Sequence, residues 1–323
     1  MIDEEWLSLR LKAKKNDTVS CRVPGSKSTS LRALLLAACM DETVTIRNIG
    51  ECDDTHSMIE CLTKLGAVIT KTGDSYVVSG NITATQFERI ITLDVGLSGL
   101  TLRFLTAICA SLPGQFVMSG EPGIERRPVM PLVESLIDAG ANIATNEHSQ
   151  NLLTIQGKRL TSDMSIDGSV SSQYVSALLL LQTIRGYGSV SVTGEQTSRS
   201  YISLTFTQIS DFGSDIRYDQ ATRNYSIHSK PCTSSYDIEP DASSAAYIYA
   251  LGVLHEQKFV VDNYDVDNSA QPDSEAIRLL VQSELPTIID CTNFPDQAMT
   301  FAYIAALSPR TTRLLGVASL RVK

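Results

Sequence analysis

An internal repeat constrains the fold of this 323-residue chain more than any other feature. At five places a cluster of small polar residues precedes a helix of small and apolar residues, and the first four start roughly 72 residues apart. A period this long fits a unit of several helices and strands rather than a solenoid repeat. The five clusters are Ser26–Ser30, Gly96–Gly99, Ser169–Gln173, Asp241–Ser244 and Pro295–Gln297.

A second type of helix is predicted between these clusters. Residues 54–65, 128–138 and 200–212 are amphipathic at helical spacing. Each is followed by a glycine placed as a helix C-cap, namely Gly66, Gly140 and Gly213. Stretches of alternating apolar residues come next and predict strands. The unit is therefore strand, helix, strand, helix and strands, with three full units over roughly residues 26–230. A fourth unit follows, and a fifth that is shortened, since Asp296 comes only 55 residues after Asp241.

Composition and charge narrow the class of protein. Apolar residues make up 43% of the chain, which is enough to build packed cores, and charged residues make up 20%. The net charge of −9 argues against binding to nucleic acid or to anionic membranes. The seven cysteines are scattered and form no CxxC pair, which favours reduced thiols in the cytoplasm over disulfides or a zinc site. No signal peptide is expected, and no apolar run in the sequence is long enough to cross a bilayer.

The repeated helix starts predict anion binding. A helix N-terminus carries free N–H groups and about half a positive charge, and small residues let an anion approach closely. Basic residues accompany these helices: Lys27, Arg32, Arg103, Arg127 and Arg199. Alternatively, the serines and aspartates are simple helix caps and the arginines surface residues. Asp54 is expected to cap its helix. No P-loop, GxSxG, HExxH or GxGxxG occurs, and the four histidines lack metal-ligand spacing.

At this point the motifs resemble those of a known family. In order along the chain they are VPGSKSTSLRALLLAA, SGLTLRFL, GEPGIERRPV, DGSVSSQYVSALL, SRSYI, EPDASSAAY, FPDQAMT and LRVK. From about Val23 to Lys323 the chain resembles the 5-enolpyruvylshikimate-3-phosphate synthases, also called 3-phosphoshikimate 1-carboxyvinyltransferases. The resemblance implies a transferase of the shikimate pathway with a two-domain, inside-out α/β barrel of βαβαββ units. Residues 25–236 would form a complete three-unit domain that binds shikimate 3-phosphate. Residues 1–24 and 237–323 would form an incomplete second domain.

The resemblance also implies roles for individual residues. Lys27 would contact both substrates, Ser28 and Arg32 would hold shikimate 3-phosphate, and Gln173 would lie between the substrates. The 3-phosphate would be bound by Ser171, Ser172 and Ser198, with Tyr201 nearby. Gly99 and Arg127 would face phosphoenolpyruvate, and Lys323 would contact shikimate 3-phosphate. Asp296 would accept the proton of the shikimate 5-hydroxyl, so Asp296 and Lys27 are the candidate catalytic residues.

In the family reaction the 5-hydroxyl adds to C2 of phosphoenolpyruvate, and phosphate is then eliminated. This chemistry needs a carboxylate beside cations and proton donors within reach. It implies no metal or other cofactor. The resemblance further implies a cytoplasmic monomer whose two domains close on the substrates.

The sequence departs from the family pattern in two respects. Leu97 and Leu100 replace the usual Asn and Thr, and Gly123 replaces a basic residue, so the phosphoenolpyruvate side has fewer polar groups. In the family, the motif that ends here at Lys323 continues further. A truncated chain, with its last unit missing and with little turnover, is therefore expected. Two alternatives stay open: a non-catalytic, anion-binding paralogue, and a UDP-N-acetylglucosamine enolpyruvyl transferase. The second is disfavoured because Gly120–Ile124 lacks the cysteine of that family.

Overall fold

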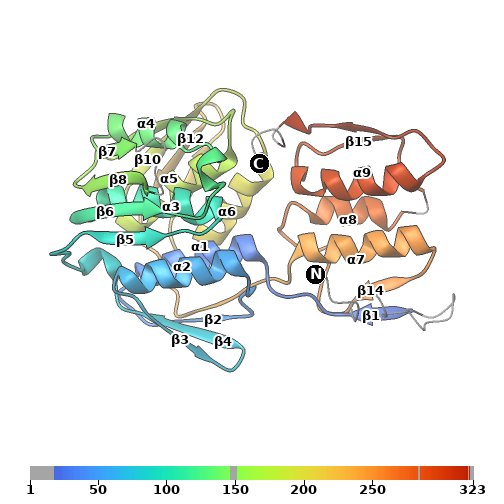
Figure 1. Ribbon diagram of the computed structural model, residues 1–323, viewed down its shortest axis with the longest axis horizontal. Helices are drawn as coiled ribbons and strands as arrows, with labels where there is room; N and C mark the ends of the chain where they lie inside the picture. The colour runs from blue at the N-terminus through green and yellow to red at the C-terminus, as the bar shows by residue number, and fades with distance from the viewer. Residues whose placement is uncertain (1–17, 146–150, 283, 319, 321–323) are drawn as a thin grey trace.

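The molecule consists of two lobes joined by two stretches of chain (Figure 1). The computed structural model describes residues 18–145, 151–282, 284–318 and 320. Each lobe has its own apolar core: one is built from residues between Leu31 and Ile238, and the other from Val23 and residues between Ala242 and Ile304. The predicted α/β class and the repeated units are therefore confirmed.

Three four-stranded sheets of the same topology form the outside of the larger lobe. Their strand orders are β13-β2-β4-β3, β5-β6-β8-β7 and β9-β10-β12-β11. In the order given, the first two strands of every sheet are parallel. The third strand is antiparallel to both of its neighbours, the second and the fourth. Along strands such as β8 and β9, buried and exposed residues alternate, so one face of the sheet meets solvent. The strands are β2 (Val44–Arg47), β3 (Val68–Thr72), β4 (Ser75–Ser79), β5 (Ile91–Asp94), β6 (Gly114–Ser119), β7 (Asn142–Thr145), β8 (Asn151–Gly157), β9 (Asp163–Asp167), β10 (Gly188–Thr193), β11 (Ile216–Asp219), β12 (Asn224–Ile227) and β13 (Ser235–Asp237).

The first sheet is completed by a strand from far along the chain. β13 runs parallel to β2, with Ser235 opposite Thr45 and Asp237 opposite Arg47. The Arg47 guanidinium also donates to the Asp237 carboxylate. Because β13 follows the third unit and pairs with the first, the three units close into a ring.

Three helices fill the middle of this ring. They are α1 (Lys27–Ala38), α3 (Gly99–Ser111) and α5 (Ser172–Arg185), and almost all of their residues are buried. A helix that is apolar or small on every side has no face suited to water, so it is stable only when surrounded. The amphipathic helices α2 (Asp53–Lys64), α4 (Met130–Asp138) and α6 (Arg199–Asp211) bury one side only. Gly66, Gly140 and Gly213 follow them in the left-handed conformation, as predicted. Short 3₁₀ turns are η2 (Ile82–Ala84) and η3 (Ile124–Arg126).

The smaller lobe has two helical units and two short parallel strand pairs. The strands are β1 (Val19–Cys21) with β14 (Phe259–Val261), and β15 (Ile288–Asp290) with β16 (Arg313–Leu315). The helices are α7 (Ala242–His255), α8 (Ser274–Leu280) and α9 (Ala298–Leu307), the last preceded by η4 (Pro295–Gln297). Helices α7 and α9 are the fourth and fifth helices of the repeat. Like α1, α3 and α5, helix α7 begins within its polar cluster, and α9 begins directly after the fifth cluster.

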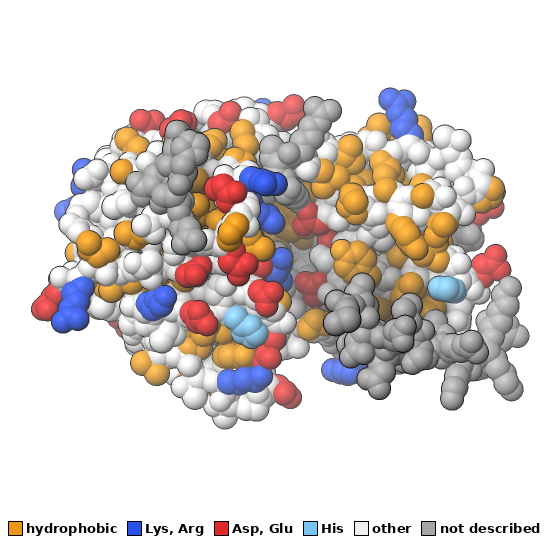
Figure 2. Space-filling view, viewed as in Figure 1, with side chains coloured by type: hydrophobic (Ala, Val, Ile, Leu, Met, Phe, Trp, Pro, Cys, Tyr) orange, Lys and Arg blue, Asp and Glu red, His pale blue; other side chains and the backbone are white. Residues whose placement is uncertain are grey.

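Unlike α1, α3 and α5 of the larger lobe, α7 and α9 expose large apolar side chains. Figure 2 shows hydrophobic side chains gathered over this lobe. The most exposed of them are Tyr247 at 55%, Met299 at 68%, Tyr303 at 62% and Leu307 at 62%. Within the described residues, no helix has the length and apolar character needed to cross a membrane.

The two stretches of chain that join the lobes are hydrogen-bonded to each other. Ser26 N–H donates to the Glu239 carbonyl at 2.8 Å, and Asp241 N–H donates to the Pro24 carbonyl at 2.8 Å. Gly25 lies against the backbone of the first unit, where an added Cβ would stand 1.7 Å from the Asn48 carbonyl oxygen. Only glycine permits this approach, so the junction packs against the first unit beside the start of α1.

Candidate active site

A cavity of about 550 Å³ lies where the two lobes meet. Its walls carry the starts of α1, α2, α3, α5 and α6 from the larger lobe and Asp296 from the smaller one. The residues predicted for the site meet there, although they are spread over 270 residues of sequence. Eleven of the twelve line the cavity, namely Lys27, Ser28, Arg32, Gly99, Arg127, Ser171, Ser172, Gln173, Ser198, Tyr201 and Asp296. The twelfth, Lys323, lies outside the described residues.

Helix N-termini give the cavity a positive electrostatic field. The helices α1, α3 and α5 begin at Lys27, Gly99 and Ser172, and all three residues line the cavity. Each N-terminus is equivalent to roughly half a positive charge, so three contribute about +1.5. The Ser98 hydroxyl accepts from Thr101 N–H at 3.2 Å and the Ser171 hydroxyl accepts from Gln173 N–H at 3.3 Å. These serines are therefore caps, as the simpler interpretation held, and Ser171 is also part of the cavity wall.

Arg32 is the most buried charge of the cavity, with 1% of its surface exposed. Its guanidinium donates from Nε to the Thr205 hydroxyl at 2.8 Å and from Nη1 to the Ser28 carbonyl at 2.7 Å, and it lies 5.3 Å from the centre of the Phe104 ring. Among the described residues, no carboxylate lies within ion-pair distance of it. Burial lowers the pKa of Arg32 to about 10, so it stays charged at neutral pH.

Arg103 forms a second buried positive centre, 4% exposed. Nη2 donates to the Pro128 carbonyl at 2.7 Å, Nη1 donates to the Gln173 side-chain oxygen, and the guanidinium lies 5.5 Å from the centre of the Tyr174 ring. Burial lowers the pKa of Arg103, and nearby Arg127 lowers it further. Two arginines that repel each other in the wall of a cavity are the arrangement expected where an anion binds between them.

Gly99 allows these two arginines to approach the start of α3. A Cβ on Gly99 would stand 2.7 Å from Nη1 of Arg103 and 3.0 Å from Cδ of Arg127. The absence of a side chain therefore opens space for the arginines, rather than serving an unusual backbone angle. This is a physical reason for glycine at the position where the resemblance places a substrate contact.

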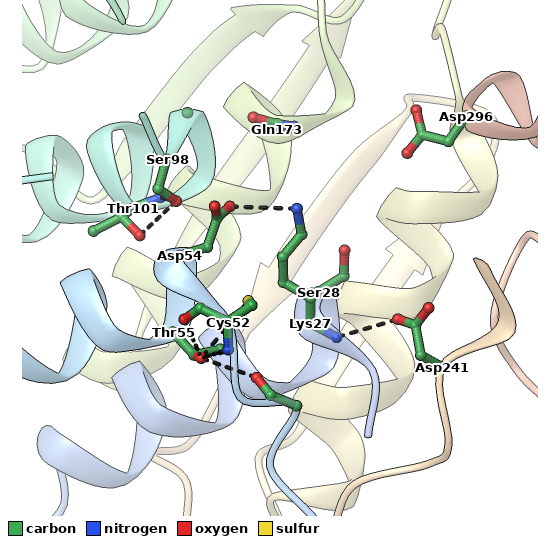
Figure 3. A network of polar contacts seen from close by, with 12 residues as sticks. Lys27, Ser28, Cys52, Asp54, Thr55, Ser98, Thr101, Gln173, Asp241 and Asp296 are labelled. Atoms are coloured by element: carbon green, nitrogen blue, oxygen red, sulfur yellow. Dashed lines mark hydrogen bonds and ion pairs between the residues drawn. The ribbon is translucent and has the colours of Figure 1, made fainter. Parts of the chain in front are cut away.

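Lys27 lies at the rim of the cavity, with 48% of its side chain exposed (Figure 3). Its ammonium is 3.4 Å from the Asp54 carboxylate, and its backbone N–H donates to Asp241 at 3.3 Å. The prediction that Asp54 caps α2 is wrong. Cys52 is the N-cap residue, and its own N–H donates to the Thr55 hydroxyl at 3.0 Å. Asp54 instead faces the cavity, where it pairs with Lys27.

The smaller lobe contributes the carboxylate of Asp296 to the cavity wall. The Tyr201 hydroxyl of α6 reaches across and lies 3.1 Å from Oδ2 of Asp296 and 3.2 Å from Oδ1 of Asp273. Burial, and then the charge of Asp273, raise the pKa of Tyr201 well above its usual value, so this phenol keeps its proton. Asp296 precedes α9 on η4, while Asp273 is 2% exposed at the start of α8.

A strained turn just before α6 brings Thr197 and Ser198 to the cavity. Ser198 has φ +49° and ψ +47°, a left-handed conformation that costs a non-glycine residue about 1 kcal/mol or more. The preceding Thr197 is held by its N–H and its hydroxyl, which both donate to the Gly168 carbonyl. The turn places Thr197 and Ser198 in the wall of the cavity beside Ser171.

The formal charges of the lining residues cancel. Four cations, Lys27, Arg32, Arg103 and Arg127, face four carboxylates, Asp53, Asp54, Glu121 and Asp296. The two signs are not mixed evenly, because the buried charges are both arginines while Asp53, Glu121 and Asp296 are exposed. Buried charges act through a medium of lower dielectric constant, so the floor of the cavity is positive despite the balanced total.

Sequence reasoning did not assign Asp54, Glu121 or Asp273 to the site. Asp54 and Asp53 have the pattern of acids at a helix start, which conceals their position on the cavity. Glu121 and Asp273 stand in no local pattern that distinguishes them from surface acids. The unusual Leu97 and Leu100 do line the cavity, Leu97 with half its surface exposed.

The described lining of the cavity contains neither histidine nor cysteine. Among the described residues no group of three or more His, Cys, Asp or Glu is placed to hold a metal ion. His56, His228 and His255 are exposed, and His148 lies outside the described residues. The seven cysteines are all free, Cys232 alone being exposed.

Solved structures of an EPSP synthase and of an enolpyruvyl transferase have a similar fold. An EPSP synthase from Acinetobacter baumannii superposes with a TM-score of 0.64 at 21% identity, over 78% of this chain and 57% of that one. The enolpyruvyl transferase NikO from Streptomyces tendae superposes with a TM-score of 0.53 at 15% identity, over 75% and 56%. These likenesses describe the fold.

Sequence similarity then identifies the family. Residues 12–285 match EPSP synthase (3-phosphoshikimate 1-carboxyvinyltransferase). The 3-phosphoshikimate 1-carboxyvinyltransferase of Pseudomonas savastanoi pv. phaseolicola is 33% identical over 93% of this chain and 72% of its own length. That of Nitrosomonas eutropha is 33% identical over 99% and 80%. The chain belongs to the EPSP synthase family. It spans a little over half of the solved EPSP synthase and about three quarters of these relatives.

Proposed function

We propose that this chain transfers the enolpyruvyl group of phosphoenolpyruvate to the 5-hydroxyl of shikimate 3-phosphate, with release of phosphate. One observation carries the proposal: eleven residues predicted from the family motifs line a single cavity whose buried charges are both arginines. Two anionic substrates need such a site, because the positive field must be concentrated locally in a chain of net charge −9. Membership of the family supports the same substrates.

We assign shikimate 3-phosphate to the part of the cavity bounded by α1, α5 and α6. Its 3-phosphate would lie against Ser171, Ser172 and Ser198, where hydroxyls and the N-terminal N–H groups of α5 offer donors. Arg32 and Ser28 would hold the same substrate from α1, and Lys323 would add a contact. Tyr201 closes this side and lies against Asp296.

Phosphoenolpyruvate would occupy the neighbouring part, between α3 and the segment around Arg127. Gly99 leaves room for the anion beside Arg103 and Arg127, and Gln173 sits between the two substrates as the acceptor of an Arg103 N–H. Lys27 lies within reach of both. Asp296 would take the proton of the 5-hydroxyl as its oxygen attacks C2, and the cations would stabilise the charge that develops before phosphate leaves.

Calorimetry and a phosphate-release assay test the proposal. The 323-residue chain should bind shikimate 3-phosphate alone and bind phosphoenolpyruvate more tightly once shikimate 3-phosphate is present. It should release phosphate only when both are added, and Asp296→Asn should keep binding while losing most of the turnover. Failure to bind shikimate 3-phosphate would refute the assignment. Linked binding of both substrates without phosphate release would favour a non-catalytic paralogue.

The setting follows from the same assignment. We propose a cytoplasmic monomer whose two lobes are domains that close when the substrates' negative charges bridge them. The reduced cysteines are compatible with that compartment.

A further inference from the structure

A single hydroxyl lies between two carboxylates at the junction of the lobes. The Tyr201 oxygen is 3.2 Å from Oδ1 of Asp273 and 3.1 Å from Oδ2 of Asp296. Since the phenol keeps its proton and has only one, it donates to one carboxylate at a time. The other carboxylate then faces an oxygen lone pair. The two acids therefore compete for one hydrogen bond.

The surroundings of Asp273 bias this competition. Its Oδ2 accepts from the Ser243 hydroxyl at 2.5 Å and from the Gln297 side-chain N–H at 2.9 Å. Gln297 is fully buried, and its carbonyl oxygen accepts from the Thr300 hydroxyl at 2.9 Å, which fixes the amide with its NH₂ group toward Asp273. Both remaining donors are thus committed to Oδ2, so Tyr201 is the donor available to Oδ1.

We propose that Asp273 is a positioning residue, which sets the basicity of Asp296 by drawing the Tyr201 proton away from it. The inference rests on the proposed role of Asp296 as the base. A base that loses a hydrogen bond to its charged form holds a proton more strongly. Asp273 does not itself line the cavity, and it acts through Tyr201, which does, and through Gln297, the residue next to Asp296.

Other charged groups also face this cluster. Asp241 at the start of α7 acts on both Tyr201 and Asp273, and it also accepts the Lys27 N–H. Arg32 on α1 interacts electrostatically with Tyr201, and Tyr264 interacts electrostatically with Asp273. Burial raises the pKa of Asp273, and its three hydrogen bonds oppose that shift. The test must therefore separate the shared hydroxyl from the plain repulsion between carboxylates.

Asp273→Asn, made with and without Tyr201→Phe, achieves this separation. In Asp273→Asn the amide oxygen should turn toward the two donors from Ser243 and Gln297, which leaves the NH₂ group facing Tyr201. Tyr201 then donates to Asp296 permanently. The midpoint of the Asp296 titration is followed by NMR of ¹³Cγ-labelled aspartate, and the signal is assigned by its loss in Asp296→Asn. This readout needs no turnover, so it stands even if the proposed reaction fails.

The expected result is a fall of about one pH unit in the Asp296 midpoint for Asp273→Asn, the size of one hydrogen bond to a charged group. In the Tyr201→Phe background the same substitution removes only the charge repulsion, so its effect should be clearly smaller. Equal shifts in the two backgrounds would overturn the proposal, because repulsion alone then explains them.

Ser243→Ala provides a second variant if Asp273→Asn does not fold. It removes a donor from Oδ2 of Asp273, so this carboxylate should attract the Tyr201 proton more strongly and the Asp296 midpoint should rise. Ser244→Ala is the matched control, since it changes the adjacent serine, whose N–H rather than side chain is bonded to Asp241. An unchanged midpoint in Ser243→Ala, or an equal rise in Ser244→Ala, would contradict the role of Asp273.

Discussion

Arg32 carries a full charge at a position almost closed to water. Burying an ion costs several kcal/mol unless it is compensated, and the partners of Arg32 are a hydroxyl, a carbonyl and an aromatic ring. A methionine of similar volume would fill the same space without that cost. The presence of arginine therefore argues for an anionic ligand, with stability given up for binding.

Arg32→Met should separate binding from stability. We expect the affinity for shikimate 3-phosphate to fall by roughly 10- to 200-fold, since a hydrogen bond to a charged group contributes about 1.5–3 kcal/mol. The unfolding temperature should stay the same or rise. Calorimetry and thermal unfolding measure the two effects. Arg217→Met, which removes an exposed arginine of the same lobe, should leave the affinity unchanged, and an equal loss there would refute the assignment.

Gly99→Ala should affect one substrate and spare the other. The new methyl group would push Arg103 and Arg127 aside, so phosphoenolpyruvate should bind at least about tenfold more weakly, a change of about 1.4 kcal/mol. Because the backbone of Gly99 is not left-handed, helix α3 should lose no stability. Titration of each substrate in turn gives the comparison. Equal weakening of shikimate 3-phosphate would mean that Gly99 does not mark the phosphoenolpyruvate side.

At the scale of elements, the joint between the lobes depends on two glycines in mutual contact. A Cβ on Gly50 would stand 2.0 Å from the Gly25 carbonyl oxygen, and the Gly50 N–H donates to the Ser30 hydroxyl at 3.0 Å. These contacts fix the start of α1, which carries Lys27, Ser28 and Arg32. A substitution that disturbs this joint would therefore displace these site residues as well as the lobes.

Gly25→Ala should be strongly destabilising. The methyl group has no room against the Asn48 backbone, so we expect a loss of about 3 kcal/mol or more in the free energy of unfolding. Gly73→Ala is the control, because an added Cβ there meets nothing within 4 Å. Its left-handed φ of +60° should cost only about 1 kcal/mol. Urea unfolding compares the two variants, and similar losses would show that crowding at the joint is unimportant.

The elements themselves could be predicted from sequence because their signals are local. Helical spacing and a following glycine placed α2, α4 and α6 correctly, and the polar clusters placed the starts of the five repeated helices. Pairings between distant segments left no such trace. Nothing near Ser235–Asp237 indicates that this strand completes the sheet of β2, and nothing near Asp273 indicates its contact with Tyr201. Asp54 was misassigned because a cap and a cavity residue look alike at a helix start.

At the scale of the whole molecule, the acidic composition predicts sensitivity to low pH. Nine mostly exposed carboxylates have their pKa lowered by hydrogen bonds or cations, whereas burial raises the pKa of Asp211 and Asp273. A carboxylate with a lowered pKa adds stability above about pH 4, and this stability is lost as the pH falls through its folded-state pKa. The nine are Glu51, Glu125, Asp167, Asp215, Asp219, Asp237, Asp265, Glu284 and Asp290.

The urea midpoint should therefore be lower at pH 3 than at pH 5. The difference should shrink in high salt, because exposed ion pairs such as Arg310–Glu284 are screened. Urea titrations at the two pH values, with and without added salt, measure it. A midpoint that is equal or higher at pH 3 would mean that the two carboxylates with raised pKa outweigh the nine.

The pairing of β1 with β14 also sets an order of events during synthesis. Val19 emerges from the ribosome early, but its partner Phe259 follows 240 residues later. At about 5–20 residues per second, this strand waits on the order of tens of seconds with its hydrogen-bonding edge unpaired. The ring of three units can close during that interval, because it is encoded entirely between the two strands. The lobe that contains the first strand is therefore the last to be assembled.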